Sequence, residues 1–164
     1  MADIRIRKRR RLRSKDIKAY SEGIGSVLGV EVFGEDDPVD LAESSDFDLL
    51  FVRGSILGMI HGGRPFLTVR GLLEYKPELR QVTVDMGAVP FVTKGADIMA
   101  PGIIDSDPAI QAGELVWIRD ERNKVPLAVG ESLMGGEEMV GADSGKAILS
   151  IHHVGDRLWK HEEP

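Results

Sequence analysis

The fold is indicated most clearly by the residues Thr93-Lys94-Gly95-Ala96-Asp97-Ile98-Met99-Ala100-Pro101-Gly102-Ile103. Gly95 predicts a tight turn, because glycine adopts backbone conformations that other residues avoid. We expect a short helix over residues 88–94, before this turn. A β-strand is expected over residues 97–104, with a bend at Pro101 and Gly102. A glycine turn also lets a ligand approach the main chain, where an exposed amide can donate to a phosphate oxygen.

Short β-prone runs continue on both sides of this stretch, punctuated by glycine and proline. Together with residues 97–104 they number six, a spacing typical of a small barrel or sandwich. The other five runs cover residues 82–85, 115–119, 126–132, 146–154 and 157–159.

The first half of the chain has a mixed α/β pattern. Ser14 is a candidate helix cap, and apolar residues at three- and four-residue spacing predict a helix that ends near Gly29. Strands are expected at residues 4–7, 47–52 and 58–62, and a short amphipathic stretch is closed by Pro77. The expected organisation is therefore an α+β protein with an α/β module over residues 1–79 and a mostly β domain over residues 80–164.

Composition excludes several classes of protein. The 164 residues include no cysteine, which excludes disulfides, thiolate metal sites and a cysteine nucleophile. No apolar run approaches the ~18 residues of a membrane span, and the basic N-terminus is not followed by an apolar stretch. We therefore expect a soluble, cytoplasmic protein.

The charge is distributed unevenly along the chain. The net charge is −6, yet residues 1–20 carry nine basic and two acidic side chains. Six of the seven residues from Arg7 to Arg13 are basic. Such a run is either a solvated surface or a phosphate-binding surface, because guanidinium groups match phosphate oxygens and neutralised phosphates release counterions. The run therefore makes nucleic acid a candidate ligand.

Motifs for other chemistries fail on spacing. The glycines of residues 23–29 and 141–147 resemble nucleotide-binding loops, but each pattern is one residue off. The adjacent His152 and His153 would point to opposite faces of a strand and so could not share a metal ion comfortably. Asp85 is more typical of a helix cap or turn than of a catalytic acid. We expect no catalytic residue, no metal site and no cofactor.

The stretch from Val84 onward resembles the signature of a PUA domain. The resemblance includes Val84-Asp85-Met86-Gly87-Ala88, the stretch quoted above and Gly155-Asp156-Arg157-Leu158-Trp159. The first half is similar to the family named for multiple copies in T-cell lymphoma, in residues 8–18 and 66–75. Archaeal members of that family carry a pre-PUA module followed by a PUA domain. The resemblance implies an N-terminal α/β pre-PUA module and a β pseudobarrel with flanking short helices that binds structured RNA.

The resemblance also implies an RNA-contact surface in the second half. This surface and the basic run together form a candidate RNA site. Within it, Met99 and Trp159 are as compatible with core positions as with RNA contacts. Residues 81–164 carry 14 acidic and 7 basic groups, which shifts the expected affinity toward the N-terminal run. The candidate residues are Arg7, Lys8, Arg9, Arg10, Arg11, Arg13, Lys94, Gly95, Ala96, Asp97, Met99, Pro101, Gly102, Trp159 and Lys160.

The function that the resemblance implies is non-catalytic RNA binding, to tRNA or the small ribosomal subunit, in translation initiation or recycling. One alternative is an adaptor for a translation-factor protein, with Leu49, Phe51 and Ile60 as contact residues. The other alternative is an accessory PUA subunit of a tRNA- or rRNA-modifying enzyme.

Overall fold

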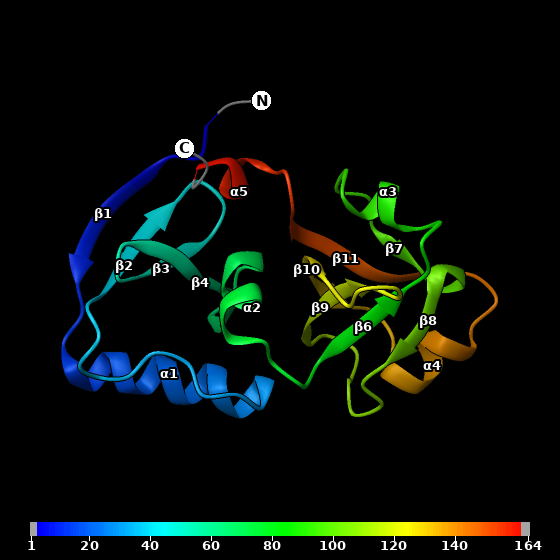
Figure 1. The fold of residues 1–164 in the computed structure, drawn as a ribbon, viewed down its shortest axis with the longest axis horizontal. Coiled ribbons are helices and arrows are strands. Elements are labelled where there is room, and N and C mark those ends of the chain that lie inside the picture. Colours follow the sequence, from blue (N-terminus) through cyan, green and yellow to red (C-terminus); the bar gives the residue numbers. More distant parts are fainter. Residues whose placement is uncertain (1–2, 162–164) are drawn as a thin grey trace. The chain divides into compact units, whose positions relative to one another are not determined.

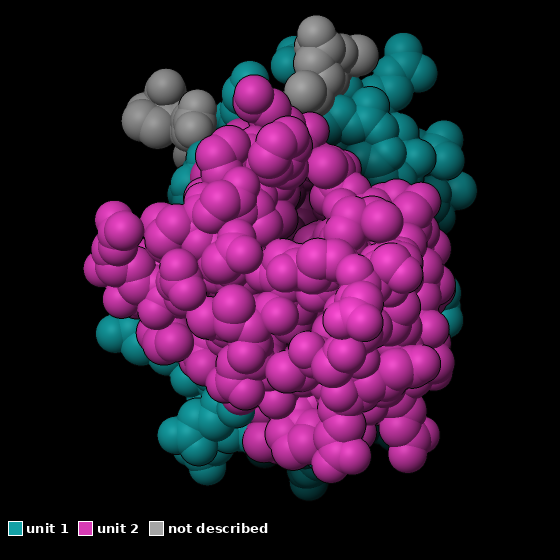
Figure 2. All heavy atoms as spheres, turned by 90° about the vertical axis from the view of Figure 1, so that its right-hand side faces the viewer, with its two compact units in different colours: residues 1–78, 157–164 teal, residues 79–156 magenta. Residues whose placement is uncertain are grey.

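The computed structural model describes residues 3–161, which belong to two compact units (Figures 1 and 2). Unit 1 comprises residues 1–78 and 157–164, and unit 2 comprises residues 79–156. Within the described residues, no helix is long and apolar enough to cross a membrane.

Unit 1 is built on a five-stranded sheet in the order β1-β2-β3-β4-β5 (Figure 1). Each strand is antiparallel to its neighbour, so consecutive strands are joined by hairpins except where α1 intervenes between β1 and β2. The strands are β1 (Ile6–Arg11), β2 (Val39–Ser44), β3 (Asp48–Val52), β4 (Ser55–His61) and β5 (Arg64–Leu67).

Helix α1 (Ser14–Leu28) follows the apolar periodicity that predicted it. Its face of Ile17, Ile24 and Leu28 is buried, and Gly29 ends it in a left-handed conformation with φ of 68°. The expected cap at Ser14 is wrong, since Ser14 is the first helical residue and the capping position falls on Arg13, which makes no side-chain cap bond.

Strand β1 contains most of the basic run, whereas the sequence predicted a strand over residues 4–7 only. Its register against β2 shifts by one residue between Arg7 and Arg10, and Lys8 has a positive φ of 53°. This irregularity is a β-bulge, in which an extra residue interrupts the alternation of side chains. The strand continues beyond the bulge to Arg11, which pairs with Asp40 of β2.

Two short helices complete unit 1. Helix α2 (Val69–Tyr75) is capped by the preceding Thr68, whose hydroxyl accepts a hydrogen bond from the Gly71 amide. Helix α5 (Arg157–His161) contradicts the strand expected at residues 157–159. Leu158 is 3% exposed and belongs to a core cluster with Ile4, Ala42 and other unit 1 residues. The last described residues therefore pack in unit 1, although the sequence placed them in the domain of residues 80–164.

Unit 2 is built on a six-stranded mixed sheet in the order β7-β11-β10-β9-β6-β8, curled into a half-barrel (Figure 1). Strands β6 and β9 are parallel, and the other neighbours are antiparallel. The strands are β6 (Gln81–Val84), β7 (Ile98–Met99), β8 (Ile103–Ser106), β9 (Leu115–Asp120), β10 (Pro126–Ser132) and β11 (Lys146–His153). This α+β architecture confirms the predicted fold class.

The strand expected over residues 97–104 is divided in two. A 3-10 turn at Ala100–Gly102 separates β7 from β8, because Pro101 has no amide to donate to a ladder. Helix α3 (Val89–Val92) precedes this region, within the helix expected at residues 88–94. Helix α4 (Gly136–Gly141) was not expected from the sequence.

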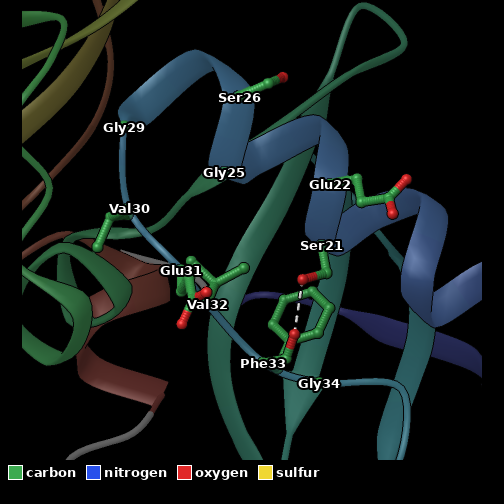
Figure 3. Close-up of a pocket in the computed structure, with 10 residues that line it drawn as sticks. All are labelled: Ser21, Glu22, Gly25, Ser26, Gly29, Val30, Glu31, Val32, Phe33 and Gly34. Carbon is green, nitrogen blue, oxygen red and sulfur yellow. Dashed lines mark hydrogen bonds between the residues drawn. The ribbon is translucent and has the colours of Figure 1, made fainter.

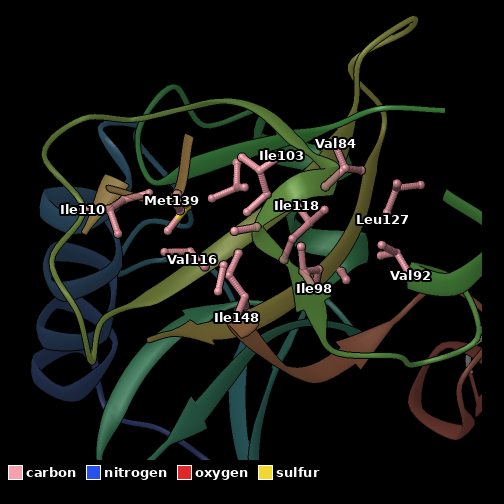
Figure 4. Close-up of a cluster of buried hydrophobic side chains, with 14 residues drawn as sticks. Val84, Val92, Ile98, Ile103, Ile110, Val116, Ile118, Leu127, Met139 and Ile148 are labelled. Carbon is pink, nitrogen blue, oxygen red and sulfur yellow. The ribbon is translucent and has the colours of Figure 1, made fainter. Parts of the chain in front are cut away.

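The core of unit 2 is an apolar cluster inside the half-barrel (Figure 4). Val116, Ile118 and Ile148 from the central strands are fully buried, and Met139 of α4 closes the cluster on one side. At Gly136 a Cβ atom would lie 2.1 Å from the Asp107 carbonyl oxygen, so only glycine lets α4 approach this closely.

Candidate nucleic-acid interface

An exposed row of cations occupies the sheet edge of unit 1. From Arg7 to Arg11 every residue of β1 is exposed, and Arg13 follows just before α1. Because β1 is an edge strand, its outer side carries no further strand. We call this surface the basic strand. It consists of Arg7, Lys8, Arg9, Arg10, Arg11 and Arg13.

Asp40 holds two of these arginines in place. Its carboxylate accepts hydrogen bonds from Nε of Arg9 at 2.8 Å and from Nε of Arg11 at 2.5 Å. The Asp40 side chain is only 13% exposed, and its bond with Arg11, more than that with Arg9, lowers the pKa of its carboxyl. The Arg9 guanidinium also lies 3.9 Å from the centre of the Phe51 ring, within cation–π range. Asp40 therefore orders Arg9 and Arg11 and partly neutralises them.

The other basic side chains fall into two groups. Arg7 and Lys8 lie 3.4 and 3.8 Å from the Glu43 carboxylate, and all three side chains are exposed enough for solvent to screen the attraction. Within the described part of the chain, the side chains of Arg10 and Arg13 have no hydrogen-bond or ion-pair partner. These two arginines carry charge that no carboxylate among residues 3–161 compensates.

The second candidate surface lies at the turn between α3 and β7 in unit 2. Lys94, Ala96, Met99 and Pro101 are exposed, and Met99 retains 49% of its accessible area, so it is a surface residue and not part of the core. Gly95 adopts a φ of 90°, as the sequence predicted for a glycine turn. We call this patch, together with Phe91, the Gly95 surface.

The amides of this turn are already used within it. The Lys94 and Ala96 amides donate to the Phe91 carbonyl, and the Gly95 amide donates to the Val92 carbonyl, at 3.0–3.1 Å. The expectation of a free amide at Gly95 is therefore wrong, because the turn closes its own hydrogen bonds. Another group would have to supply the polar contact at this position.

Asp97 and Gly102 have structural contacts at the edge of the Gly95 surface. The Asp97 carboxylate accepts the Ser150 amide at 2.8 Å and pairs with the Lys146 ammonium at 3.0 Å. The Ser150 amide, and then Lys146, lower the pKa of this carboxyl. The Gly102 carbonyl accepts the Asp85 amide at 2.9 Å. Asp97 thus joins the turn to β11, and Gly102, the last residue of the 3-10 turn, is joined to the residue that follows β6.

Phe91 is the residue that the sequence reasoning missed. Its side chain is 66% exposed on the four-residue helix α3, next to the buried Val92. The Ala96 amide donates to the Phe91 carbonyl, so the aromatic residue adjoins the turn. In the apolar run Val89-Pro90-Phe91-Val92, nothing in the sequence indicates which side chain points outward.

Trp159 and Lys160 belong to unit 1 and not to the unit that carries the Gly95 surface. The Arg70 guanidinium lies 3.8 Å from the centre of the Trp159 ring, and its Nη2 donates to the Trp159 carbonyl at 2.9 Å. Trp159 therefore attaches α5 to α2. Lys160 is exposed in the last turn of α5.

A groove of about 810 Å³ separates α1 from the segment that follows it in unit 1 (Figure 3). The Ser21 hydroxyl donates to the Phe33 carbonyl at 2.6 Å and bridges the two sides. The charged side chains that line the groove are Glu22 and Glu31, both acidic. This groove is therefore unsuited to a phosphate.

The histidine pair and Asp85 have structural partners. His152 is 1% exposed, with Nδ1 2.8 Å from the Asp156 carboxylate, and the Asp85 carboxylate accepts the Ala88 amide at the start of α3. Across residues 3–161, no three His, Asp or Glu side chains are grouped so that they could hold a metal ion.

Known proteins match this chain over almost its whole length. The family model described as PUA domain matches residues 80–154. An uncharacterised protein of Methanocaldococcus jannaschii is 37% identical, with 94% of this chain and 96% of that protein aligned. Translation machinery-associated protein 20 of Saccharomyces cerevisiae is 31% identical, over 92% of this chain and 86% of the relative.

A solved structure shows the same architecture. A hypothetical protein of Pyrococcus horikoshii superposes with a TM-score of 0.83 at 32% identity, covering 93% of this chain and 98% of the other. Malignant T-cell-amplified sequence 1 of Rattus norvegicus is 31% identical and is covered over 74% of its length. The chain therefore belongs to the family of PUA-domain proteins that includes translation machinery-associated protein 20 and malignant T-cell-amplified sequence 1.

Proposed function

We propose that this protein is a non-catalytic, cytoplasmic RNA-binding protein that contacts tRNA or the small ribosomal subunit during translation initiation or recycling. The basic strand is the observation that carries the proposal. Arg10 and Arg13 hold uncompensated charge on an ordered surface, where each neutralised phosphate would release a counterion. The family relationship to a translation machinery-associated protein supports the choice of RNA.

The Gly95 surface supports the same proposal with a different chemistry. It combines one ammonium group, Lys94, with the exposed apolar side chains Phe91 and Met99. Aromatic and apolar side chains stack on unpaired bases, and A-form RNA is read through its backbone and 2′-hydroxyls. In unit 2 acidic residues outnumber basic ones, so this surface is expected to add specificity to an affinity that comes mainly from the basic strand.

The catalytic alternative has little support. The Asp85 carboxylate accepts the Ala88 amide at the start of α3, and the His152 imidazole is 1% exposed with its Nδ1 against the Asp156 carboxylate, so both groups have structural partners. The proposal therefore assigns any chemistry on the bound RNA to another protein, for which this chain would be an accessory subunit.

A protein adaptor remains the competing function, but two of the three residues first expected to make the contact are buried, and the third, Ile60, is only partly exposed. Leu49 is fully buried and Phe51 is 5% exposed in the core of unit 1, so they cannot form a contact surface. The exposed Phe91 and Met99 are the better candidates for a translation-factor partner.

Equilibrium binding of the full chain to unfractionated tRNA and to purified small ribosomal subunits tests the proposal. Binding to either at low salt, weakened steeply by added salt, is the expected result. If neither RNA binds, and a protein partner is still pulled down after nuclease treatment, the adaptor function replaces the proposed RNA-binding function.

A further inference from the structure

The His153 imidazole lies directly against the Gly95 turn. A Cβ atom placed on Gly95 would lie 2.8 Å from Nε2 of His153, and the glycine has a φ of 90°. A side chain at this position would be both strained and in collision with the ring. His153 is the last residue of β11. The end of this strand and the Gly95 turn therefore form one continuous surface.

The hydrogen bond on the other side of the ring determines what Nε2 can do. Nδ1 of His153 lies 2.8 Å from the Val154 carbonyl oxygen. Because a carbonyl oxygen only accepts, Nδ1 must carry the hydrogen, and in the neutral ring Nε2 is left as an acceptor. Among the described residues Nε2 has no partner, and it is not one of the enclosed polar atoms that lack one. It is therefore an acceptor that a ligand can reach.

No other polar group of the turn offers the same contact. The amides of Lys94, Gly95 and Ala96 all donate inside the turn. The other polar group that the turn presents is the ammonium of Lys94, the residue before Gly95, which has no carboxylate partner in the described structure and can only donate. An anionic phosphate oxygen suits Lys94 but is repelled by the lone pair of a neutral Nε2.

A ribose supplies the complementary pair of groups. Its 2′-hydroxyl can donate to Nε2, while the phosphate of the same strand accepts from Lys94. We propose that His153 reads the 2′-hydroxyl of a nucleotide bound at the Gly95 surface, so that this surface distinguishes RNA from DNA. This inference rests on the proposed RNA-binding function and adds to it a residue and a chemical group that carry the discrimination.

The test compares RNA and DNA versions of one ligand. The probe is a minihelix copy of a tRNA acceptor stem with its single-stranded 3′ end, made as RNA and as DNA. The expected result is that His153→Phe weakens RNA binding by about three- to tenfold, the range for one neutral hydrogen bond. Binding of the DNA copy should stay unchanged, because phenylalanine keeps the ring and DNA lacks the hydroxyl. Equal weakening of RNA and DNA binding would overturn the inference.

Lys94→Gln is the matched control. It removes a phosphate contact that RNA and DNA share. It should therefore lower the affinity for both ligands alike and leave the ratio of the two affinities unchanged. His153→Gln keeps an acceptor at this position and should retain part of the preference for RNA. If Lys94→Gln changes the ratio of RNA affinity to DNA affinity as strongly as His153→Phe does, His153 is not the residue that distinguishes RNA from DNA.

A second measurement uses only the unaltered protein and is independent of the folding of any variant. Single 2′-deoxy and 2′-O-methyl substitutions are scanned along the RNA minihelix. One position should lose about three- to tenfold in affinity with both modifications, because each removes the hydroxyl donor. If RNA with a 2′-O-methyl group binds as well as the unmodified RNA wherever the modification is placed, the inference is contradicted. If neither RNA nor DNA binds at low salt, the proposed function itself fails.

Discussion

Asp97 accepts a hydrogen bond from the Ser150 amide at 2.8 Å and so connects the Gly95 turn to the middle of β11. A residue that resemblance marked as an RNA contact is thus occupied inside the protein. Its second oxygen pairs with Lys146, the residue opposite Met99 in the ladder of β7 and β11. Through these two contacts Asp97 positions the Gly95 surface.

The stability that Asp97 provides depends on pH. Because its folded pKa is lowered, its contribution is present above the ordinary value of about 3.9 and is lost as the pH falls through the folded value. At pH 7, Asp97→Asn should lower the free energy of unfolding by about 1 kcal/mol, a figure that allows for solvent screening. Urea denaturation at pH 7 and pH 3 should show this difference shrinking in acid. A difference of the same size at both pH values contradicts the assignment.

Gly95→Ala should destabilise unit 2 by about 1–3 kcal/mol. The alanine would have to adopt a φ of 90°, and its Cβ would meet His153 at 2.8 Å. Thermal or urea unfolding measures the loss. Gly141→Ala is the control, because Gly141 ends helix α4 and a Cβ there has nothing within 4 Å. It should be neutral or stabilising by up to about 1 kcal/mol. Equal losses for the two variants would show that the contact with His153 has no special cost.

Phe91→Ser should leave stability within about 0.5 kcal/mol of the original, because the side chain is 66% exposed. Its effect on RNA binding should be larger, at about 1–3 kcal/mol if a base stacks on the ring. The measurement is tRNA affinity by fluorescence anisotropy. Leu133→Ser removes another exposed apolar side chain, 42% exposed and outside the Gly95 surface, and should leave the affinity unchanged. An unchanged affinity for Phe91→Ser would remove this residue from the interface.

Asp40→Asn should strengthen binding of tRNA by about two- to fivefold at low salt. The substitution removes the internal counterion of Arg9 and Arg11, which a phosphate can then replace. Asp105→Asn makes the same change of charge at an exposed position of strand β8 and should have little effect. A weaker complex with Asp40→Asn would mean that ordering the two arginines matters more than their free charge.

The basic strand was predicted from the sequence only in part. The arginine run and its chemistry are evident from the residues alone, but the strand was expected to end at Arg7. It continues because Asp40 and Glu43 of β2 lie opposite the basic side chains and pair with them. Those acidic residues lie about thirty positions further along the chain, in a segment for which no strand was expected. The sequence therefore did not predict β2, the partner strand of β1.

The C-terminal segment was misjudged for the same physical reason. Arg157-Leu158-Trp159 has the composition of a strand, yet Leu158 fills the unit 1 core and Arg70 packs on Trp159 from 89 residues away. Such long-range contacts override local propensity. The Gly95 turn, in contrast, depends on the conformational freedom of a single residue, which the sequence shows directly.

The most direct test of the account is the salt dependence of tRNA affinity in two variants that each remove two positive charges. Arg10→Gln with Arg13→Gln acts on the uncompensated arginines of the basic strand, and Arg122→Gln with Lys124→Gln acts on the exposed β9–β10 hairpin. We expect the first pair to reduce the slope of log affinity against log salt by about 1.4–1.8, the value for two phosphate contacts. The hairpin pair should leave the slope unchanged. Identical slopes for both variants and the original protein would contradict the central claim that the basic strand binds the RNA backbone.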